Sequence, residues 1–390
     1  MSNTSRPARR PAGSLLPDFP WDALEPARRT ARSHPGGMID LSVGTPVDPV
    51  APAIQLALAE AGSAPGYPQT KGTAELRAAV VGAMERRFGV TGLDPETGVL
   101  PVIGTKEAIA WLPTLLGTGE GHDVVIPELA YPTYEVAARL AGAGVVRSDA
   151  PWDLDRVPSL VFINSPANPH GAVLGVGELR RVVGWAREHD VIVVSDECYL
   201  GLGWEEAVDG STATTAPVSV LDPRVCDGDH RQLLAVHSLS KTSNLASYRA
   251  GFLAGDTGLI AELLSVRRHA GLMVPGPIQA AMTTALSTDD QEILQKELYR
   301  SRRRVLADAL HAAGFTVDRS EAGLYLWVTE GAPCRETVDR FAAWGILVAP
   351  GEFYGPAGER HVRIGLTGTN EAVHLAAERL AAVARAADGN

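Results

Sequence analysis

The sequence has few cysteines, no excess of positive charge and no long apolar run. Its three cysteines are an odd number without the spacing of metal ligands, so we expect reduced thiols in a cytoplasmic protein and no metal site. The formal net charge of -11 argues against nucleic acid or an anionic membrane as the main partner. No apolar run approaches the roughly 20 residues that cross a bilayer, and the N-terminus lacks the apolar core of a signal peptide.

The chain contains enough hydrophobic residues to form a large core. It has 390 residues, of which 45% are hydrophobic, and this suits a large α/β domain accompanied by a smaller one. Helical periodicity alternates with short apolar runs, the pattern of parallel βαβ units. Helices are expected at 53–61, 73–88, 106–116, 177–189 and 258–269. Strands are expected at 123–126, 160–164, 191–195, 233–237 and 251–254.

The pattern changes near Pro275. Beyond it we expect a long helix at 290–313, strand-like runs at 315–328, 346–348 and 361–366, and a closing helix from Asn370. We therefore predict an α/β fold with a large domain at 36–275, built on a mostly parallel sheet flanked by helices, and a smaller α+β domain at 276–390. Residues 1–35 are expected to form an N-terminal arm, part of which joins the smaller domain.

Polar side chains follow three of the expected strands. Asn168, Asp196 and Ser238 each stand just beyond an apolar run. Ligands of open α/β sheets bind beyond the carboxyl ends of the strands. Lys241 stands three residues after Ser238, and Arg249 follows Lys241 at a distance of two helical turns. We therefore expect one binding site that contains all five residues.

These residue types fit pyridoxal phosphate (PLP), a cofactor that carries the difficult chemistry itself. A partly desolvated Lys241 would attack a carbonyl as the Schiff-base partner and would later move a proton at the substrate Cα. Asp196 would pair with the protonated pyridine nitrogen, while Tyr199 and Asn168 would reach the phenolic oxygen of the ring. The simpler alternatives are a surface lysine, a turn cap at Asp196, a core tyrosine and a plain loop at Asn168.

A helix start supplies an expected phosphate site. Gly104, Thr105 and Lys106 open a helix directly after an apolar run. Free backbone N–H groups and the helix dipole make such a start attractive to anions. Ser238 and Arg249 would complete the phosphate cup. The alternative is that Thr105 is an ordinary N-cap.

Two further residues extend the expected site. Tyr131 stands in a loop before a helix and would stack on one face of the cofactor ring, although buried loop aromatics are common. Arg363 stands in an alternating run near the C-terminus and would clamp a substrate α-carboxylate, which places Cα for reaction. A surface arginine on a strand is the alternative for Arg363.

Together these motifs resemble the fold-type I, class I/II aminotransferases, over nearly the whole chain. The segment 41–46 is similar to the family's glycine loop, which implies that Gly44 and Asn168 join Arg363 in binding the substrate. Gly66-Tyr67-Pro68 is similar to the segment whose tyrosine reaches the phosphate of the neighbouring subunit, and 350–355 is similar to the loop before the carboxylate-binding arginine. The resemblance implies PLP-dependent amino transfer by a homodimer with shared active sites.

A narrower resemblance concerns the substrate. The segments 16–21, 127–134 and 236–245 are similar to the actinobacterial succinyldiaminopimelate transaminases of lysine biosynthesis. This implies amino transfer between the glutamate/2-oxoglutarate pair and an N-succinylated diamino diacid. The sequence departs from the expected pattern beside the cofactor loops, where Thr, a basic residue and Gly are usual, at His170, Ala172 and Ser247. These departures put the substrate and the reaction outcome in question.

Two other functions remain open from the sequence. A PLP enzyme on the same scaffold would perform β- or γ-elimination, replacement or carbon–carbon bond formation on an amino acid such as S-adenosylmethionine. A PLP-binding transcriptional regulator would carry an N-terminal DNA-binding domain, whereas only about 35 residues precede the glycine loop and the chain is acidic. We therefore expect a PLP-dependent aminotransferase that acts on small amino and oxo acids.

Overall fold

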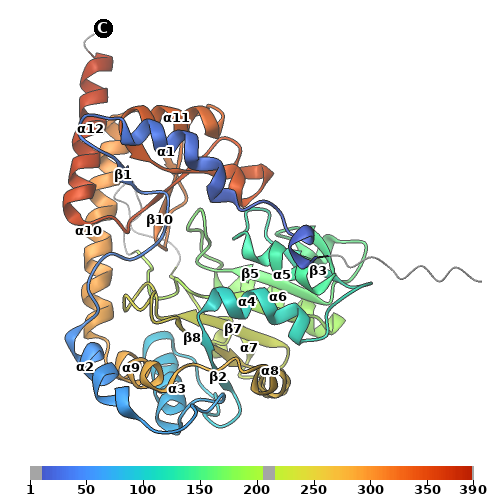
Figure 1. Ribbon diagram of the computed structural model, residues 1–390. Helices are drawn as coiled ribbons and strands as arrows, with labels where there is room; N and C mark the ends of the chain where they lie inside the picture. The colour runs from blue at the N-terminus through green and yellow to red at the C-terminus, as the bar shows by residue number, and fades with distance from the viewer. Residues whose placement is uncertain (1–10, 205–215, 389–390) are drawn as a thin grey trace, which may run out of the picture.

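A seven-stranded sheet forms the centre of the molecule (Figure 1). The computed structural model describes residues 11–204 and 216–388, so residues 1–10 of the expected arm lie outside the described part. In spatial order the strands are β2 (Val99–Ile103), β8 (Ala250–Gly255), β7 (Leu233–Ser238), β6 (Ile192–Asp196), β5 (Leu160–Asn164), β3 (Asp123–Ile126) and β4 (Gly144–Arg147). β8 runs antiparallel to β2 and β7, and the other pairs are parallel. The predicted α/β class with a mostly parallel sheet is confirmed.

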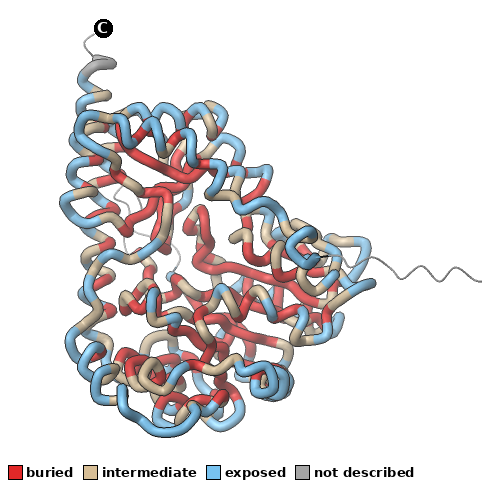
Figure 2. Tube along the Cα trace, viewed as in Figure 1, coloured by how far each residue is buried: buried red, intermediate tan, exposed pale blue. Residues whose placement is uncertain are grey.

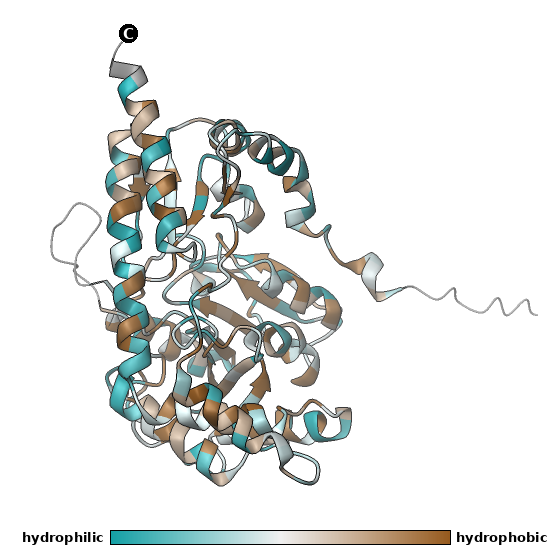
Figure 3. Ribbon diagram, turned by 60° about the vertical axis from the view of Figure 1, so that its left-hand side comes forward, coloured by the Kyte–Doolittle hydropathy of each residue, from teal (hydrophilic) through white to brown (hydrophobic). Residues whose placement is uncertain are grey.

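Helices cover both faces of this sheet, which explains why its strands are apolar on both sides. On one face, Ile109 of α4, Tyr134 of α5 and Leu263 of α8 are buried against the strands. On the other face, α2, α3, α6 and α9 form a second apolar layer, which includes Val80 and Met282. Figure 2 shows the buried strands between these layers, and Figure 3 shows their hydrophobic character. The bounds are α2 (Pro52–Glu60), α3 (Ala74–Phe88), α4 (Thr105–Leu115), α5 (Thr133–Ala141), α6 (Val176–His189), α7 (Pro223–Cys226), α8 (Thr257–Ala270) and α9 (Gly276–Ser287).

The C-terminal elements surround a third core, which N-terminal residues join. A four-stranded antiparallel sheet has the order β12 (Ala349–Pro350), β13 (Val362–Gly365), β10 (Tyr325–Thr329) and β9 (Thr316–Asp318). The remaining elements are α1 (Glu25–Arg32), β1 (Ile39–Asp40), α10 (Asp290–Ala312), α11 (Cys334–Ala343), β11 (Ile346–Leu347) and α12 (Asn370–Asp388). β1 pairs with β11, and Leu24 and Ala31 are buried in this core. The division into domains near residue 275 stays a prediction.

The connection from Lys241 to Arg249 differs from the expected helical spacing. Residues 239–249 form bends and turns, with positive φ angles at Asn244 and Arg249. The reason is the antiparallel pairing of β7 with β8, in which Ser238 lies opposite Gly251. An antiparallel neighbour requires the chain to turn back on itself, so a helix between these two residues is the wrong expectation.

The described residues form no membrane-spanning helix, no candidate metal cluster and no disulfide bond. No helix in 11–204 or 216–388 is long and apolar enough to cross a membrane. Within the same ranges no group of three or more His, Cys, Asp or Glu side chains is placed to hold a metal ion. Cys198, Cys226 and Cys334 are all free thiols. The cytoplasmic location expected from the cysteine content stays a prediction.

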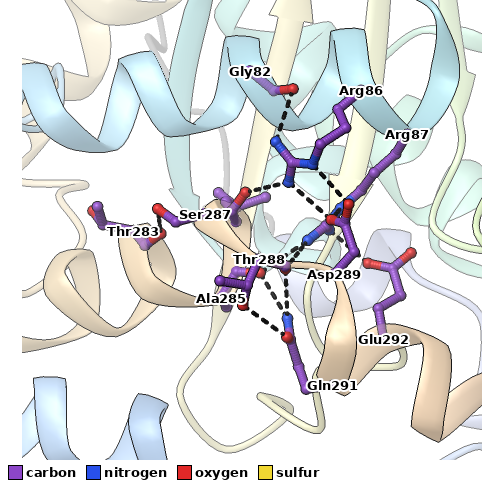
Figure 4. Close-up of polar contacts among 11 residues, drawn as sticks. Gly82, Arg86, Arg87, Thr283, Ala285, Ser287, Thr288, Asp289, Gln291 and Glu292 are labelled. Atoms are coloured by element: carbon purple, nitrogen blue, oxygen red, sulfur yellow. Dashed lines mark hydrogen bonds and ion pairs between the residues drawn. The ribbon is translucent and has the colours of Figure 1, made fainter.

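Two arginines at the end of α3 bind the junction between α9 and α10 (Figure 4). Arg86 and Arg87 both donate to the carboxylate of Asp289, at distances of 2.6–2.8 Å. Arg87 also donates to Glu292 at 2.5 Å and to the carbonyl of Thr288 at 2.7 Å. The hydrogen bonds from Arg86, followed by those from Arg87, hold the pKa of Asp289 at about 2. Of the four charged side chains at the junction, Arg87 and Glu292 are buried, whereas Arg86 and Asp289 are partly exposed.

We predict that Arg87→Ala destabilises the protein by about 3 kcal/mol, because it removes the cation that is paired with the buried carboxylate of Glu292. The measurement is the thermal melting temperature of the purified protein. Arg231→Ala is the matched control, since the Arg231 side chain is 79% exposed and the carboxylate with which it pairs, that of Asp229, is 35% exposed. Equal melting temperatures for the Arg87 variant and the control would contradict this account of the junction.

Candidate active site

A cleft of about 830 Å³ lies at the carboxyl ends of the parallel strands. Its walls come from the N-terminal segment, from the loops after β5, β6 and β7, and from β10 and β13. A more open hollow of about 1000 Å³, beside Arg87 and Asp222, contains none of the predicted site residues. The cleft brings together Gly44, Thr105, Lys106, Tyr131, Asn168, Asp196, Tyr199, Ser238, Lys241, Arg249 and Arg363.

Lys241 presents its amine inside this cleft. The Nζ atom donates a hydrogen bond to the carbonyl of Gly44. The hydroxyl of Tyr299 donates to the backbone carbonyl of Lys241 at 3.2 Å, which fixes the turn that carries the side chain. Burial lowers the pKa of Lys241, against the opposing effect of Tyr325. A lysine amine that loses its proton readily is a nucleophile and a base.

Asp196 ends β6 and lies at the base of the cleft. Its carboxylate accepts hydrogen bonds from the Tyr134 hydroxyl at 2.7 Å and from the backbone N–H of Cys198 at 3.2 Å. Burial raises the pKa of Asp196, and the hydrogen bonds only partly oppose this rise. A cation placed against the carboxylate would restore its ionised form. Tyr134 was not singled out from the sequence as a site residue, and nothing local marks it, because it reaches Asp196 from a helix 62 residues away.

Arg363 is buried, which excludes the alternative of a surface strand arginine. Its side chain is 2% exposed, and its guanidinium donates to the Oδ1 atom of Asn168 at 2.9 Å and to the carbonyl of Ser42 at 2.7 Å. The same group lies 3.8 Å from the centre of the Tyr325 ring and 5.0 Å from that of Tyr354, in the loop expected to precede this arginine. The contacts with the two tyrosine rings and the hydrogen bonds to the two acceptors hold the guanidinium in one orientation.

Tyr325 is a site residue that sequence reasoning missed. Its hydroxyl lies 3.2 Å from that of Tyr199, and a Cβ added at Gly44 would come within 1.9 Å of it. Burial would raise the pKa of Tyr325, but the positive charges of Arg363 and Lys241 outweigh burial and lower it. Gly44 is therefore required by the close approach of a phenol from β10. No local sequence motif predicts the contact between Tyr325 and Tyr199, since 126 residues separate them.

Cations and a helix start meet at the other end of the cleft. Gly104, with a φ of 76°, is the N-cap of α4, so the reading of Thr105 as the N-cap is wrong. Burial and the charge of Arg249 lower the pKa of Lys106. Two adjacent cations beside the N-terminus of α4 make a site for a doubly charged anion such as phosphate. Ser238, which accepts a hydrogen bond from the backbone N–H of Ser240 at 3.1 Å, lies on the same wall.

The N-terminal segment also lines the cleft. Residues 16–21, which belong to the expected N-terminal arm and to the motifs of the narrower resemblance, form part of its wall. Trp21 lies 5.6 Å from Phe353, and the Lys106 amine lies 5.6 Å from the centre of the Phe19 ring. Phe19 is 56% exposed. The segment therefore brings aromatic side chains to the cleft.

Tyr131 and Tyr67 have different surroundings. Tyr131 lies in the cleft, edge-on to Tyr134 at 5.8 Å, and burial raises the pKa of Tyr131 to about 12. Tyr67 is 98% exposed and does not line the cleft of its own chain.

The three departures from the expected motif lie outside the cleft wall. His170, Ala172 and Ser247 are absent from the residues that line it. Burial, followed by the charge of Arg319, lowers the pKa of His170 to about 4, and its Nδ1 atom accepts a hydrogen bond from the backbone N–H of Ala172 at 3.2 Å. His170 therefore organises a turn.

Comparison with known proteins identifies the family. The model of the aminotransferase class I and II family matches residues 36–380. A probable aminotransferase of Mycobacterium tuberculosis is 60% identical over 375 residues, which cover 96% of this chain and 87% of the relative. The chain is a class I and II aminotransferase.

Two other relatives carry more specific names. The 4-dedimethylamino-4-oxo-anhydrotetracycline transaminase OxyQ of Streptomyces rimosus is 52% identical and covers 94% of this chain and 99% of its own length. The solved structure of N-succinyldiaminopimelate aminotransferase from Mycobacterium tuberculosis is 26% identical, with a TM-score of 0.82 over 96% of this chain and 100% of that one. The predicted aminotransferase activity and fold type are confirmed.

Aminotransferases of this family depend on PLP, and the cleft fits that cofactor. Three groups line the same cleft: the amine of Lys241, the buried carboxylate of Asp196 with its raised pKa, and an anion-binding site formed by positively charged side chains. A Cβ at Gly104 would come within 2.3 Å of the Arg249 guanidinium, so this guanidinium packs directly against the start of α4. The chemistry of these donors matches an aldehyde, a pyridine nitrogen and a phosphate.

We predict that Gly104→Ala raises the dissociation constant for PLP about tenfold, equivalent to about 1.4 kcal/mol, because the new methyl group displaces Arg249. Gly142→Ala is the matched control: Gly142 has the same φ of 76°, but a Cβ there would meet nothing within 4 Å. Alanine at position 142 stays in the left-handed helical region, with a ψ of 14°, whereas alanine at position 104 also meets a ψ of 151° that L residues rarely adopt. Fluorescence titration with PLP therefore measures the displacement of Arg249 and this backbone strain together. An unchanged dissociation constant in Gly104→Ala would contradict the close contact between the start of α4 and Arg249.

Proposed function

We propose that this aminotransferase moves the amino group between glutamate/2-oxoglutarate and a second amino or oxo acid, with N-succinyl-diaminopimelate of lysine biosynthesis as the first candidate. The observation that carries the proposal is the buried guanidinium of Arg363, held beside the Lys241 amine by Tyr325. An amino acid bound through its α-carboxylate to Arg363 would have its Cα within reach of Lys241. The relative that is named for N-succinyldiaminopimelate supports the choice of substrate.

The residues at the reacting end would divide the work of binding and proton transfer. When bound, PLP supplies an electron sink for the negative charge that develops at the substrate Cα. Lys241 would hold the cofactor covalently and, once free, would move the proton at that Cα. Asp196 would keep the pyridine nitrogen protonated, while Tyr199 and Asn168 would donate to the phenolic oxygen. Tyr131 would cover one face of the ring.

The phosphate end would anchor the cofactor. The N-terminal turn of α4, with Thr105, would present N–H groups and a hydroxyl, and Ser238 would add a second hydroxyl. Arg249 and Lys106 would balance the negative charge.

The far end of the substrate would meet the N-terminal segment. Phe19, Trp21 and Phe353 form an aromatic wall near Lys106. This wall would pack against an extended carbon chain. A bulky ring ketone is a second candidate acceptor, because the aromatic wall suits a planar surface and a relative 52% identical is named for such a compound.

A homodimer would complete the phosphate site. Tyr67 is 98% exposed on the isolated chain, which is unusual for so large an aromatic side chain. The resemblance to the family places this tyrosine at the phosphate of the neighbouring subunit. We therefore infer that Tyr67 of each chain serves the cleft of the other.

The alternative to transamination is a different reaction of the substrate after its Cα has been activated. The residues that would activate Cα are the same for transamination and for β- or γ-elimination, replacement or carbon–carbon bond formation. An amino acid with a good leaving group, such as S-adenosylmethionine, would suit the alternative. The family match supports transamination.

Borohydride reduction of the holoenzyme, followed by peptide mapping, should place the pyridoxyl group on Lys241. Lys241→Ala should keep the fold, measured by circular dichroism, and lose turnover by several orders of magnitude, since both the covalent partner and the proton carrier are removed. A pyridoxyl label on any other lysine would overturn this assignment.

Addition of glutamate to the holoenzyme should convert the cofactor absorbance to that of the pyridoxamine form, with 2-oxoglutarate detected by mass spectrometry. A second addition of the oxo form of N-succinyl-diaminopimelate should restore the original spectrum. If glutamate leaves the spectrum unchanged, glutamate is not the donor. Release of a leaving group from S-adenosylmethionine would instead support the alternative reaction.

A further inference from the structure

The back of the sheet, opposite the cleft, carries two buried ionisable residues with no role in the mechanism above. Asp196 and Ser238 point to the cleft side of β6 and β7, and because side chains alternate along a strand, Glu197 and His237 lie on the other side. Glu197 is 2% exposed and His237 is 5% exposed. The Oε2 atom of Glu197 lies 3.0 Å from the Nε2 atom of His237.

Both side chains are held firmly. The Oε1 atom of Glu197 accepts hydrogen bonds from the Ser195 hydroxyl at 2.9 Å and from the backbone N–H of Val220 at 2.7 Å. The imidazole of His237 is stacked between Phe88, at 5.7 Å, and Phe252, at 5.0 Å. These contacts fix the acid and the imidazole relative to β6 and β7.

The two facing atoms still lack well-aligned partners. Among the described residues, neither the Oε2 atom of Glu197 nor the Nε2 atom of His237 makes a hydrogen bond of good geometry, although the atoms are close. Buried polar atoms without a partner are costly, and ordered water commonly satisfies them. A cavity of about 20 Å³ is lined by both residues and by Glu292, and this volume holds one water molecule.

Glu292 connects this cavity to the arginine cluster of Figure 4. Its carboxylate accepts a hydrogen bond from Arg87 at 2.5 Å. Burial raises the pKa of Glu292, and the charges of Arg87 and His237 oppose that rise. The groups that face His237 are thus the acids Glu197 and Glu292, with the Arg87 cation behind Glu292 and Asp196 on the far side of the sheet.

We propose that Glu197 and His237, bridged to Glu292 by one buried water, are positioning residues that fix the cofactor floor and favour the ionised form of Asp196. The inference rests on the proposed role of Asp196 opposite the pyridine nitrogen. Glu197 directly follows Asp196, and His237 directly precedes Ser238. The backbone N–H of Glu197 also donates to the carbonyl of Val236 at 2.9 Å, so the two strand ends move as one unit.

The electrostatic part of this support has a definite sign. Burial raises the pKa of Asp196; hydrogen bonds from Cys198 and Tyr134 and the positive charge of His237 lower it. Loss of the His237 charge therefore raises the pKa of Asp196 further. Cofactor binding through an ionised Asp196 is lost as the pH falls through that pKa, so the loss should begin at a higher pH when His237 is neutralised.

The test is the dissociation constant for PLP measured as a function of pH in wild type and His237→Phe. Phenylalanine keeps the stack between Phe88 and Phe252 and removes the charge. We expect the pH at which binding weakens on acidification to move upward in the variant. Curves that stay parallel, with the same midpoint, would overturn the proposal, because a purely structural role weakens binding by one factor at every pH.

Two further variants make the result decisive. The double variant Glu197→Gln with His237→Phe removes the unpaired acid that could unfold the single variant, and its midpoint should move less than that of His237→Phe, because loss of the Glu197 negative charge opposes loss of the His237 positive charge. Asp196→Asn should lose the acid-dependent weakening altogether. If Asp196→Asn keeps it, the proposed role of Asp196 fails; if only the His237 variants match wild type, the inference alone fails.

The water has its own test. A high-resolution crystal structure of the holoenzyme should contain one water within hydrogen-bond distance of Glu197, His237 and Glu292. A dry cavity at that position would contradict the bridge.

Discussion

The burial of the Arg363 guanidinium is the constraint on which the rest of the cleft depends. A buried cation needs acceptors, and here these come from Asn168 in the loop after β5 and from Ser42 near the N-terminus. One side chain therefore joins β13 to two segments that are far apart in the sequence. Tyr325 is drawn against it, and Gly44 is needed to make room for that phenol. The contacts that stabilise the buried charge of Arg363 therefore determine the shape of the cleft where the substrate is expected to bind.

The alternation of side chains along β6 and β7 serves both faces of the sheet. On the cleft side it presents Asp196 and Ser238, and on the back it presents Glu197 and His237. A shift of register by one residue would exchange the two sets. Apolar layers on both faces hold that register. The packing of the core therefore also determines where the reacting groups lie.

Much of the site could be predicted from sequence because its signals are local. Asp196, Ser238 and Lys241 follow apolar runs that become β6 and β7, and strand ends are where ligands bind. Tyr134, Tyr325 and the 16–21 segment could not be found this way, since only tertiary contacts bring them to the cleft. The spacing of Lys241 and Arg249 suggests a helix, but the pairing of β7 with β8, rather than local propensity, decides the course of the chain between them.

The most direct test of the central claim is exchange of the glutamate Cα hydrogen for deuterium, followed by NMR in D₂O. Arg363→Lys keeps the charge but not the planar fork that fixes the substrate carboxylate. The account predicts exchange catalysed by the wild-type holoenzyme and slowed about 100-fold in this variant, because Cα is no longer held over the Lys241 amine. Equal exchange rates in the two proteins would contradict the account.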